Sequence, residues 1–313
     1  MEQQNTPTQR LIITTRESAL ALWQANFVKD RIREYYPKTE IDLLGTTTAG
    51  DQILDRPLAQ IGGKGLFIKE LEVAMQEKRA DLAVHSLKDV PMVLPEGFTL
   101  AAVLKREDPR DAFVSPKFAS LAELPAGAIV GTGSLRREVQ LRERYPNLDI
   151  RPLRGNVNTR LKKLDEAQYD AIVLAAAGLI RLGLADRIRS FLSIEESLPA
   201  VGQGALAIEC LTARDDLIVS LTPLIDPPTL IAVTAERAFS RALGGSCETP
   251  LAAHASFDDQ GVLTLRGFVA DQQGKEIIRG QLSSAAIRVR EAQKLGEELA
   301  ARFVARGVKR LLP

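Results

Sequence analysis

The sequence contains few residues of the kinds that bind metals or form cross-links. It has two cysteines, Cys210 and Cys247, and two histidines. Because two cysteines cannot build a disulfide framework and no Cys/His cluster has metal-ligand spacing, we expect neither a disulfide-stapled fold nor a structural metal site. Cys210 closes the apolar run GALAIEC and is predicted to be a buried small side chain. Cys247 lies among small residues in ALGGSCETPL, and this context leaves the purpose of its thiol open.

An excess of charge of one sign, a high aromatic content and long apolar runs are also absent. Over 313 residues the net charge is +1 and aromatic residues make up 5%, so composition points to no nucleic-acid partner. No segment approaches the roughly 20 consecutive apolar residues that span a bilayer, and the N-terminal MEQQNTPTQR lacks the apolar core of a secretion signal. We therefore expect a cytoplasmic, monomeric protein that binds neither nucleic acid nor membrane.

An α/β pattern occurs twice along the chain. Residues 10–15 are predicted to form a strand, 18–35 an amphipathic helix and 40–44 a second strand. The same order returns within 128–154, where Ser134 is expected to cap the helix. The repeat predicts two similar α/β lobes, and the length of the chain predicts two or three domains.

A second pair of matching segments supports the repeat. The helices predicted at 65–80 and 156–169 each lead into a strand that an aspartate opens, Asp81 in the first lobe and Asp170 in the second. The first lobe has about 20 extra residues, and they fall on the Gly- and Thr-rich segment 45–65. This segment is predicted to be a mobile loop over a site, with a disordered surface insertion as the alternative.

The pattern changes after about residue 226 and is typical of a separate small α+β domain. The elements predicted there are a helix at 229–243, strands near 250–257, 261–270 and 275–282, and a helix at 285–306. Three prolines are expected to mark the junction: Pro223, Pro227 and Pro228.

Polar side chains, most of them cationic or hydroxyl-bearing, gather just beyond the predicted strands. They are Arg16, Ser18, His85, Ser86, Lys88, Asp89, Thr132, Ser134, Arg136, Arg137, Arg154, Arg160 and Arg181. Parallel sheets bind ligands at the carboxyl ends of their strands, and arginine forks and helix N-termini bind carboxylates and phosphates. The set therefore predicts a ligand with several anionic groups in a cleft between the lobes, although each arginine alone is more often a solvated surface charge.

Two motifs in this set leave alternatives open. GTGSLRR is similar to a dinucleotide fingerprint, but Arg136 stands where the third glycine should be. Asp89 is the one carboxylate in HSLKDVP. It is either a turn residue beside Lys88 or a catalytic group that stabilises a developing cation or moves a proton.

Several longer motifs occur in an order that resembles one family. They are HSLKDVP, GGKGLFIKELE, REDPRDAFVS, GTGSLRR, RGNVNTRLKKLD, LPAVGQGALAIE and the cysteine loop. These motifs resemble those of porphobilinogen deaminases, also called hydroxymethylbilane synthases, over nearly the whole chain from Arg10 onward. The resemblance implies a transferase of tetrapyrrole and heme biosynthesis that releases ammonia from four porphobilinogen molecules and joins them head to tail into hydroxymethylbilane.

The resemblance also implies a fold class and a domain division. The fold class is α/β, with two lobes like those of a type II periplasmic binding protein, a cleft between them, and a small C-terminal α+β domain. In this family the chain returns to the first lobe after the second. The implied domains are 1–104 with 201–225, then 105–200, and finally 226–313, which bears the cysteine loop.

The functional residues of the family match positions in this sequence. By this resemblance Cys247 carries a dipyrromethane cofactor through a thioether, and Asp89 is the catalytic aspartate. Cofactor contacts are implied for Ser18, Lys88, Thr132, Ser134, Arg136, Arg137 and Arg160. Substrate contacts are implied for Arg16, Arg154, Arg181, Lys64, Phe67 and Gln203. No metal is implied.

The sequence departs from the family pattern at three positions. Gly133 stands where serine is common, Gln60 where lysine is common, and Ser246 where glycine is frequent. None of these changes removes a catalytic group, and Gln60 is expected to weaken one carboxylate contact. Two rival classes remain: a non-catalytic two-lobed binding protein for a small polyanion, and an NADP-dependent reductase.

Overall fold

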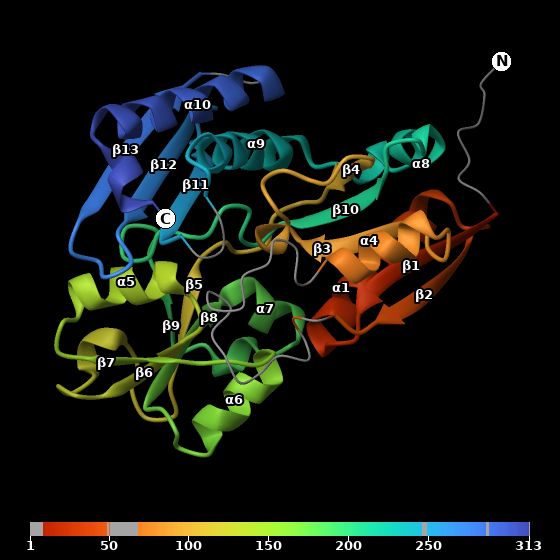
Figure 1. Cartoon of the computed structure of the whole chain (residues 1–313). Coiled ribbons are helices and arrows are strands. Elements are labelled where there is room, and N and C mark those ends of the chain that lie inside the picture. The colour runs from red at the N-terminus through yellow and green to blue at the C-terminus, as the bar shows by residue number, and fades with distance from the viewer. Residues whose placement is uncertain (1–8, 49, 51–67, 246–248, 286–287, 313) are drawn as a thin grey trace. The chain divides into compact units, whose positions relative to one another are not determined.

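The computed structural model divides the chain into two compact units and contains three β-sheets (Figure 1). It describes residues 9–48, 50, 68–245, 249–285 and 288–312. Of these described residues, those up to 106 and those in 205–230 form the first unit, and those in 107–204 and from 231 onward form the second. We call the first unit the first lobe, and residues 107–204 of the second unit the second lobe.

The first lobe is a five-stranded sheet in the order β2-β1-β3-β10-β4, with β10 antiparallel to both neighbours. Its strands are β1 (Arg10–Arg16), β2 (Glu40–Thr46), β3 (Leu82–Ser86), β4 (Phe98–Val103) and β10 (Leu206–Leu211). Its helices are α1 (Ala19–Tyr35), α4 (Lys69–Gln76) and α8 (Asp215–Ser220). Strand β10 follows the second lobe in the chain, so this sheet is completed by a distant segment of sequence.

Helix α1 begins and ends where the sequence predicts. Ser18 is the N-cap, and its hydroxyl accepts a hydrogen bond from the amide of Ala21 at 3.3 Å. The helix ends one residue before Tyr36, and Pro37 follows. Its buried face, which packs on the inner side of the sheet, consists of Gln24, Ala25, Val28 and Ile32.

The second lobe is a five-stranded sheet in the order β7-β6-β8-β5-β9. Its strands are β5 (Asp111–Val114), β6 (Ile129–Thr132), β7 (Asp149–Pro152), β8 (Ala171–Ala175) and β9 (Ser190–Leu192). Its helices are α5 (Leu135–Arg144), α6 (Val157–Asp165) and α7 (Ala176–Arg181). Here β5 is antiparallel to both neighbours, as β10 is in the first lobe.

One detail of the predicted helix start is wrong in the second lobe. Ser134 occupies the N-cap position of α5, but its side chain accepts no hydrogen bond from the helix. The Thr132 hydroxyl instead accepts a bond from the Ser134 amide at 3.3 Å, so the turn is held from the strand side. Helix α6 is capped in the expected way, because Asn156 Oδ1 accepts from the Thr159 amide at 2.9 Å.

The repeat predicted from the sequence extends to individual hydrogen bonds. Asp81 Oδ2 accepts from the amide of Ile12 at 2.8 Å, and Asp170 Oδ2 accepts from the amide of Ile129 at 2.8 Å. In both lobes the residue three positions before this aspartate has a left-handed backbone conformation, which is uncommon for residues other than glycine. The φ angle is 59° at Lys78 and 57° at Ala167. The same strand junction is therefore built twice.

The C-terminal part of the second unit is an antiparallel sheet in the order β11-β12-β13 with two helices. Its elements are α9 (Pro227–Ala242), β11 (Leu251–Phe257), β12 (Leu263–Ala270), β13 (Ile277–Ser284) and α10 (Val289–Ala305). Pro227 and Pro228 open α9 and do not form a linker, because proline fits the first helical turn, where no amide donor is needed. The helix predicted at 229–243 therefore begins two residues earlier than expected, and the junction that the prolines are expected to mark stays a prediction.

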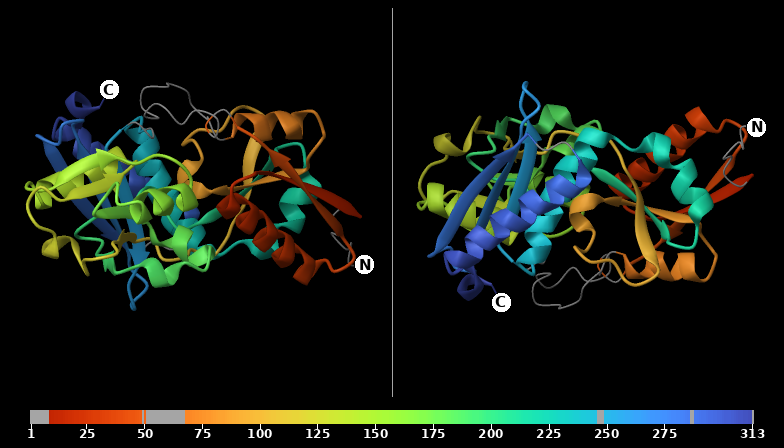
Figure 2. Two further views of the ribbon diagram at one scale, coloured as in Figure 1. Left: turned by 90° about the horizontal axis from the view of Figure 1, so that it is seen from below. Right: turned by 90° about the horizontal axis from the view of Figure 1, so that it is seen from above.

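Helices α9 and α10 pack against each other and against one face of this sheet, and Figure 2 shows α10 running along it. A Cβ on Gly296 of α10 would lie 2.3 Å from the Ala235 carbonyl oxygen of α9, so only glycine permits this approach. The opposite face of the sheet contributes Phe268 and Ala270 to a core that also contains Val139 of the second lobe.

The predicted fold class is confirmed in its elements: two α/β lobes and a small α+β part. The domain boundaries and the cleft between lobes stay predictions. Most of the predicted loop at 45–65 falls on residues 49 and 51–67, outside the described part of the chain. Among the described residues, no helix combines the length and apolarity needed to cross a membrane.

Candidate functional site

Several predicted site residues of the first lobe line one small pocket. Strands β1 and β3 are parallel neighbours, so their carboxyl ends meet at one edge of the sheet. The pocket at this edge has a volume of about 60 Å³, room for a few water molecules. Among its lining residues are Arg16, Ser18, His85, Ser86 and Asp89.

The floor of this pocket is fixed by hydrogen bonds, whereas Asp89 is exposed. Gln24 of α1 donates from Nε2 to the Ser86 hydroxyl at 2.8 Å, which ties the end of β3 to the helix. The next residues, Leu87–Asp89, form a single 3-10 turn that buries Leu87 and leaves the Asp89 side chain exposed. Lys88 is half-buried on the same turn. The Asp89 carboxylate is thus exposed on a turn that follows directly from the hydrogen-bonded end of β3.

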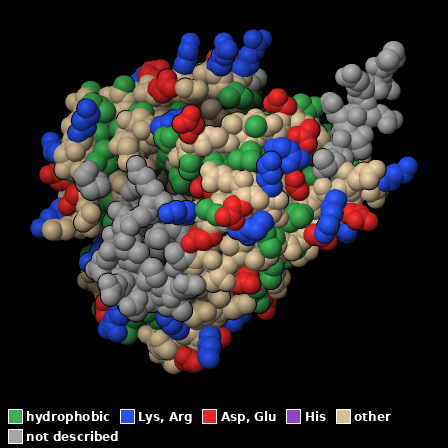
Figure 3. All heavy atoms as spheres, turned by 45° about the vertical axis from the view of Figure 1, so that its right-hand side comes forward, with side chains coloured by type: hydrophobic (Ala, Val, Ile, Leu, Met, Phe, Trp, Pro, Cys, Tyr) green, Lys and Arg blue, Asp and Glu red, His purple; other side chains and the backbone are tan. Residues whose placement is uncertain are grey.

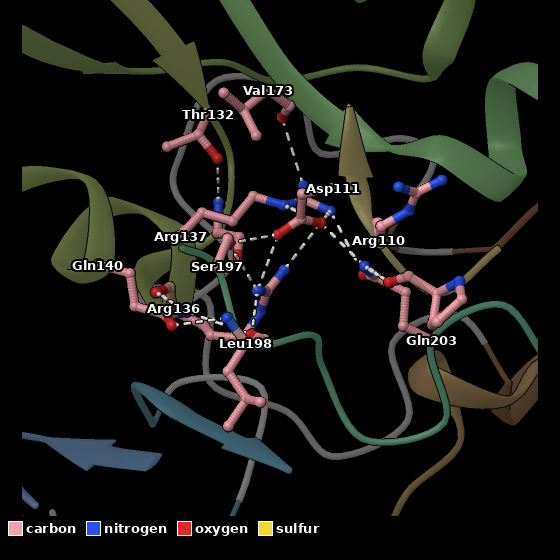
Figure 4. A network of polar contacts seen from close by, with 12 residues as sticks. Arg110, Asp111, Thr132, Arg136, Arg137, Gln140, Val173, Ser197, Leu198 and Gln203 are labelled. Carbon is pink, nitrogen blue, oxygen red and sulfur yellow. Dashed lines mark hydrogen bonds and ion pairs between the residues drawn. The ribbon is translucent and has the colours of Figure 1, made fainter. Parts of the chain in front are cut away.

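In the second lobe, two predicted arginines converge on one buried carboxylate (Figure 4). Asp111, the first residue of β5, is fully buried. Its Oδ2 lies 2.9 Å from Arg136 Nη1, and its Oδ1 lies 2.8 Å from Arg137 Nη2. Ser197 adds a third donor, from its hydroxyl to Asp111 Oδ2 at 2.7 Å. The start of α5 is therefore pinned to β5 by charge.

Charge within this network outweighs the cost of burial. Burial alone would raise the pKa of the Asp111 carboxyl, but the guanidiniums of Arg136 and Arg137 lower it well below its usual range. Arg136 Nη1 also donates to the Leu198 carbonyl at 2.6 Å, so much of its donor capacity is used inside the protein. Its predicted contact with a ligand stays a prediction, as does that of Arg137.

Gln203 joins the same network from the turn that precedes β10 (Figure 4). Its Nε2 donates to Asp111 Oδ1 at 2.8 Å and to the Pro109 carbonyl at 2.7 Å. The neighbouring residues of this turn are held separately. Glu236 Oε2 accepts from the Gly202 amide at 2.7 Å, and Arg181 Nη2 donates to the Gly204 carbonyl at 2.6 Å.

Arg181 lies apart from the Asp111 network, and only 8% of it is exposed. Burial lowers the pKa of its guanidinium to about 10, while the charge of Glu107 opposes that shift. The side chain therefore remains charged at neutral pH. Its hydrogen bond to Gly204 places this charge on the turn that carries Gln203.

The remaining predicted arginines of the second lobe lie near the turn after β6. A Cβ on Gly133 would lie 2.6 Å from the Leu153 carbonyl oxygen and 3.6 Å from Arg160 Nη2. Glycine is therefore required by this backbone, and it leaves Arg160 next to the start of α5. Arg160 Nε donates to the Gly155 carbonyl at 2.7 Å. Arg154 is half-buried, and burial lowers its pKa.

The structure thus brings the predicted residues together in two sets, one in each lobe. Arg16, Ser18 and Asp89 share the first-lobe pocket. Arg136, Arg137 and Gln203 share the Asp111 network, with Thr132 and Ser134 on the turn before α5. The predicted roles of Cys247, Lys64 and Phe67, and the departures Gln60 and Ser246, lie outside the described residues.

Sequence reasoning missed the buried partners of these residues. Asp111 lies in the motif REDPRDAFVS and opens a buried strand, and an acidic residue at such a place is a signal that could have found it. Glu209 of β10 is also fully buried and lies 2.8 Å from His85. The sequence around it, ALAIEC, carried the same signal.

Cys210 behaves as predicted. It is fully buried, and burial raises the pKa of its thiol to about 11, which disfavours the reactive thiolate. Among the described side chains, no group of three or more His, Cys, Asp or Glu residues is arranged to hold a metal ion. On the face shown in Figure 3, acidic and basic side chains are intermixed.

Comparison with protein families gives two matches. Residues 11–219 match the sequence model described as porphobilinogen deaminase, dipyromethane cofactor binding domain. Residues 230–305 match the porphobilinogen deaminase C-terminal domain. The two matches together cover most of the chain.

Individual relatives are similar over almost their whole length. The porphobilinogen deaminase of Ralstonia nicotianae is 57% identical over 97% of this chain and 91% of its own. The porphobilinogen deaminase of Nitrosomonas europaea is 58% identical over 97% of both chains. Among solved structures, the methionine binding protein MetQ is similar over 69% of this chain and 95% of its own, with 12% identity and a TM-score of 0.43.

Proposed function

This chain belongs to the porphobilinogen deaminase family, and we propose that it joins four porphobilinogen molecules head to tail into hydroxymethylbilane, with loss of ammonia at each addition. The observation that carries the proposal is 57% identity to a porphobilinogen deaminase over nearly the full length of both chains. We propose that the protein is a transferase of tetrapyrrole biosynthesis and that it acts as a monomer in the cytoplasm.

The residues of the two lobes fit a dipyrromethane cofactor, whose pyrrole rings bear acetate and propionate groups. Carboxylates are bound best by arginine forks and by amides at a helix start. The second lobe offers both at α5, with Arg137, Arg160 and Ser134 close to its first turn. We propose that these residues hold the cofactor together with Thr132, Arg136, Ser18 and Lys88.

The attachment point we propose is Cys247, through a thioether. Cys210 is buried in the first-lobe core and its thiol has a raised pKa, so it is unsuited to this bond. The sequence has one other cysteine. When bound, the cofactor supplies a pyrrole ring to which the first substrate unit is added.

Asp89 is the residue we propose as catalytic. Loss of ammonia from the aminomethyl group of porphobilinogen leaves a cation on the substrate, and a carboxylate nearby stabilises that charge. Asp89 is exposed at the mouth of a pocket whose lining also contains Arg16 and Ser18. In this role it orients the pyrrole N–H groups and accepts or returns a proton.

Substrate carboxylates are proposed to bind to arginines that the fold already holds in place. Arg181 and Gln203 are fixed by the turn before β10, and Arg154 lies beyond β7. Arg16 adds a cation in the first-lobe pocket. Lys64 and Phe67 are proposed from the family resemblance alone.

A direct assay separates this function from the alternative of a non-catalytic binding protein for a small polyanion. Purified protein is incubated with porphobilinogen, and ammonia and linear tetrapyrrole are measured over time. We expect about four ammonia molecules for each tetrapyrrole released, the ratio that the joining of four units requires. Saturable binding of porphobilinogen without any ammonia would contradict the proposal and favour the binding protein.

A further inference from the structure

A cluster of three titratable side chains lies beneath the Asp89 pocket, between the first-lobe sheet and α4. His85 of β3 lines the pocket, and its Nε2 is 2.8 Å from Glu209 Oε2 on the neighbouring strand β10. Both side chains are buried, with 5% of the His85 and none of the Glu209 side chain exposed. The third member, Glu72, is half-buried on α4. We call these three residues the proton chain.

The second carboxylate oxygen of Glu209 indicates how Glu72 is linked to the pair of Glu209 and His85. Among the described residues, Glu209 Oε1 has no hydrogen-bond donor, although it is fully buried. A buried carboxylate oxygen without a donor is costly. The neighbouring Glu72 carboxyl can supply one, because a protonated carboxyl donates through its O–H. We infer that a protonated Glu72 donates to Glu209, whose Oε2 lies 2.8 Å from His85 Nε2.

The chemistry of Glu72 agrees with this arrangement. Burial and the charge of Glu209 together raise the pKa of the Glu72 carboxyl to about 7, and the charge of His85 opposes this shift. Glu72 therefore gains and loses its proton near neutral pH. Its side chain is half-buried on α4 and so is partly accessible to solvent.

The groups that face His85 come from every element around it. Glu209 approaches from β10 and Glu72 from α4, while Asp89 and Arg16 line the same pocket on its other side. The pocket volume of about 60 Å³ has room for water between the imidazole and the Asp89 carboxylate. Asp89 and His85 therefore share one pocket, and the Glu209 carboxylate is hydrogen-bonded to the imidazole.

We propose that Glu72, Glu209 and His85 set the protonation of the Asp89 pocket during each addition, with Glu209 as the positioning residue that holds His85. The inference rests on the proposed function. In one addition, the bond between the methylene carbon and nitrogen breaks, and a bond from that carbon to the next pyrrole forms. The pyrrole carbon loses a proton and the departing ammonia gains one. The proton chain donates a proton to the departing nitrogen and regains one from the pyrrole carbon after the new bond has formed, so it ends each addition in the protonation state in which it began.

The test compares three variants by the pH dependence of kcat and by KM. Glu72→Gln keeps a donor toward Glu209 but cannot titrate, so the inflection near pH 7 is expected to disappear while the fold is kept. Glu209→Gln keeps the shape but removes the charge that holds His85, and we expect kcat to fall by roughly 10²-fold, the lower range for a positioned acid or base, with KM little changed. Glu77→Gln, an exposed change at the end of α4, is the control with an unchanged profile.

A merely structural role predicts a different result. If wild-type protein forms tetrapyrrole and the pH profiles of Glu72→Gln and Glu209→Gln superimpose on it, the inference is overturned and the proposed function stands. A lower rate in Glu209→Gln accompanied by a retained inflection in both variants also overturns it. If wild-type protein releases no ammonia from porphobilinogen at any pH, the proposed function itself fails.

Discussion

The two lobes share a fold but place their buried charges in different ways. In both sheets three parallel strands, in the order second, first and third along the chain, are followed by an antiparallel strand and an edge strand. In both, an aspartate accepts a hydrogen bond from an amide of the first of the parallel strands. Ser86 of the first lobe pairs with Leu206, whereas the matching Ala175 of the second lobe pairs with Asp111. The residue paired with the last position of the third parallel strand is therefore an apolar core residue, Leu206, in the first lobe. In the second lobe it is Asp111, the centre of an ionic network.

The difference separates two chemical tasks. In the second lobe, Asp111 fixes two arginines at the start of α5, which suits the binding of carboxylates. In the first lobe the buried acid is Glu209, which faces a histidine beneath the pocket that Asp89 shares. The repeated scaffold thus places a buried acid between two arginines in one lobe and beside a histidine in the other.

The largest effect is expected from removing the charge that distinguishes the first-lobe pocket. Asp89→Asn should lower turnover by roughly 10²- to 10⁴-fold, because a positioned carboxylate contributes on that scale. The fold should be kept, since the Asp89 side chain is exposed. Steady-state rates and circular dichroism check both expectations. Glu96→Gln, an exposed change in the segment before β4, is the control, and a near-normal rate in Asp89→Asn would refute the catalytic role.

The next largest effect is expected in the second lobe, on stability. Asp111→Asn leaves Arg136 and Arg137 buried without a counter-charge, which should lower the free energy of unfolding by about 3–5 kcal/mol. Chemical denaturation of the variant checks this value. Asp108→Asn is the matched control, because its pair with the partly exposed Arg110 is worth at most about 1 kcal/mol.

The dependence of the free energy of unfolding on pH, measured in acid, tests the same ionic network. Because the pKa of Asp111 is lowered from its usual 3.8, its contribution is fully present above that pH and is lost as pH falls through the lower folded value. The difference between wild type and Asp111→Asn should therefore shrink only below about pH 4. A difference that vanishes near neutral pH would contradict the ionic account of the network.

A smaller effect is expected where the lobes are alike. Asp170→Ala removes the acceptor of the Ile129 amide, and Asp81→Ala removes that of Ile12, each costing about 1–3 kcal/mol. Asp81→Ala should cost more, since Asp81 also pairs with Arg214 at 2.7 Å. Hydrogen exchange at the two isoleucine amides measures the loss directly. Unchanged protection at both would show that the repeated bond does not hold these strands.

Sequence periodicity predicted the shared features of the lobes well. The extent of helix α1, the two strand-opening aspartates and the burial of Cys210 follow from local rules. The ionic partners did not follow, because Asp111 meets Arg136 across 25 residues and Glu209 meets His85 across 124. Which buried acid faces which cation depends on strand order and register, and β10 reaches its sheet only after the whole second lobe. The start of α9 was predicted two residues late, because proline is compatible both with a linker and with the first turn of a helix.

The central claim is that this chain carries a dipyrromethane cofactor on Cys247, and intact mass spectrometry tests it most directly. Protein from cells that make porphobilinogen should be heavier than its sequence by two linked pyrrole units. The increase should disappear in Cys247→Ser and persist in Cys210→Ala. A wild-type mass equal to that of the bare chain, or an adduct that remains in Cys247→Ser, would contradict the account.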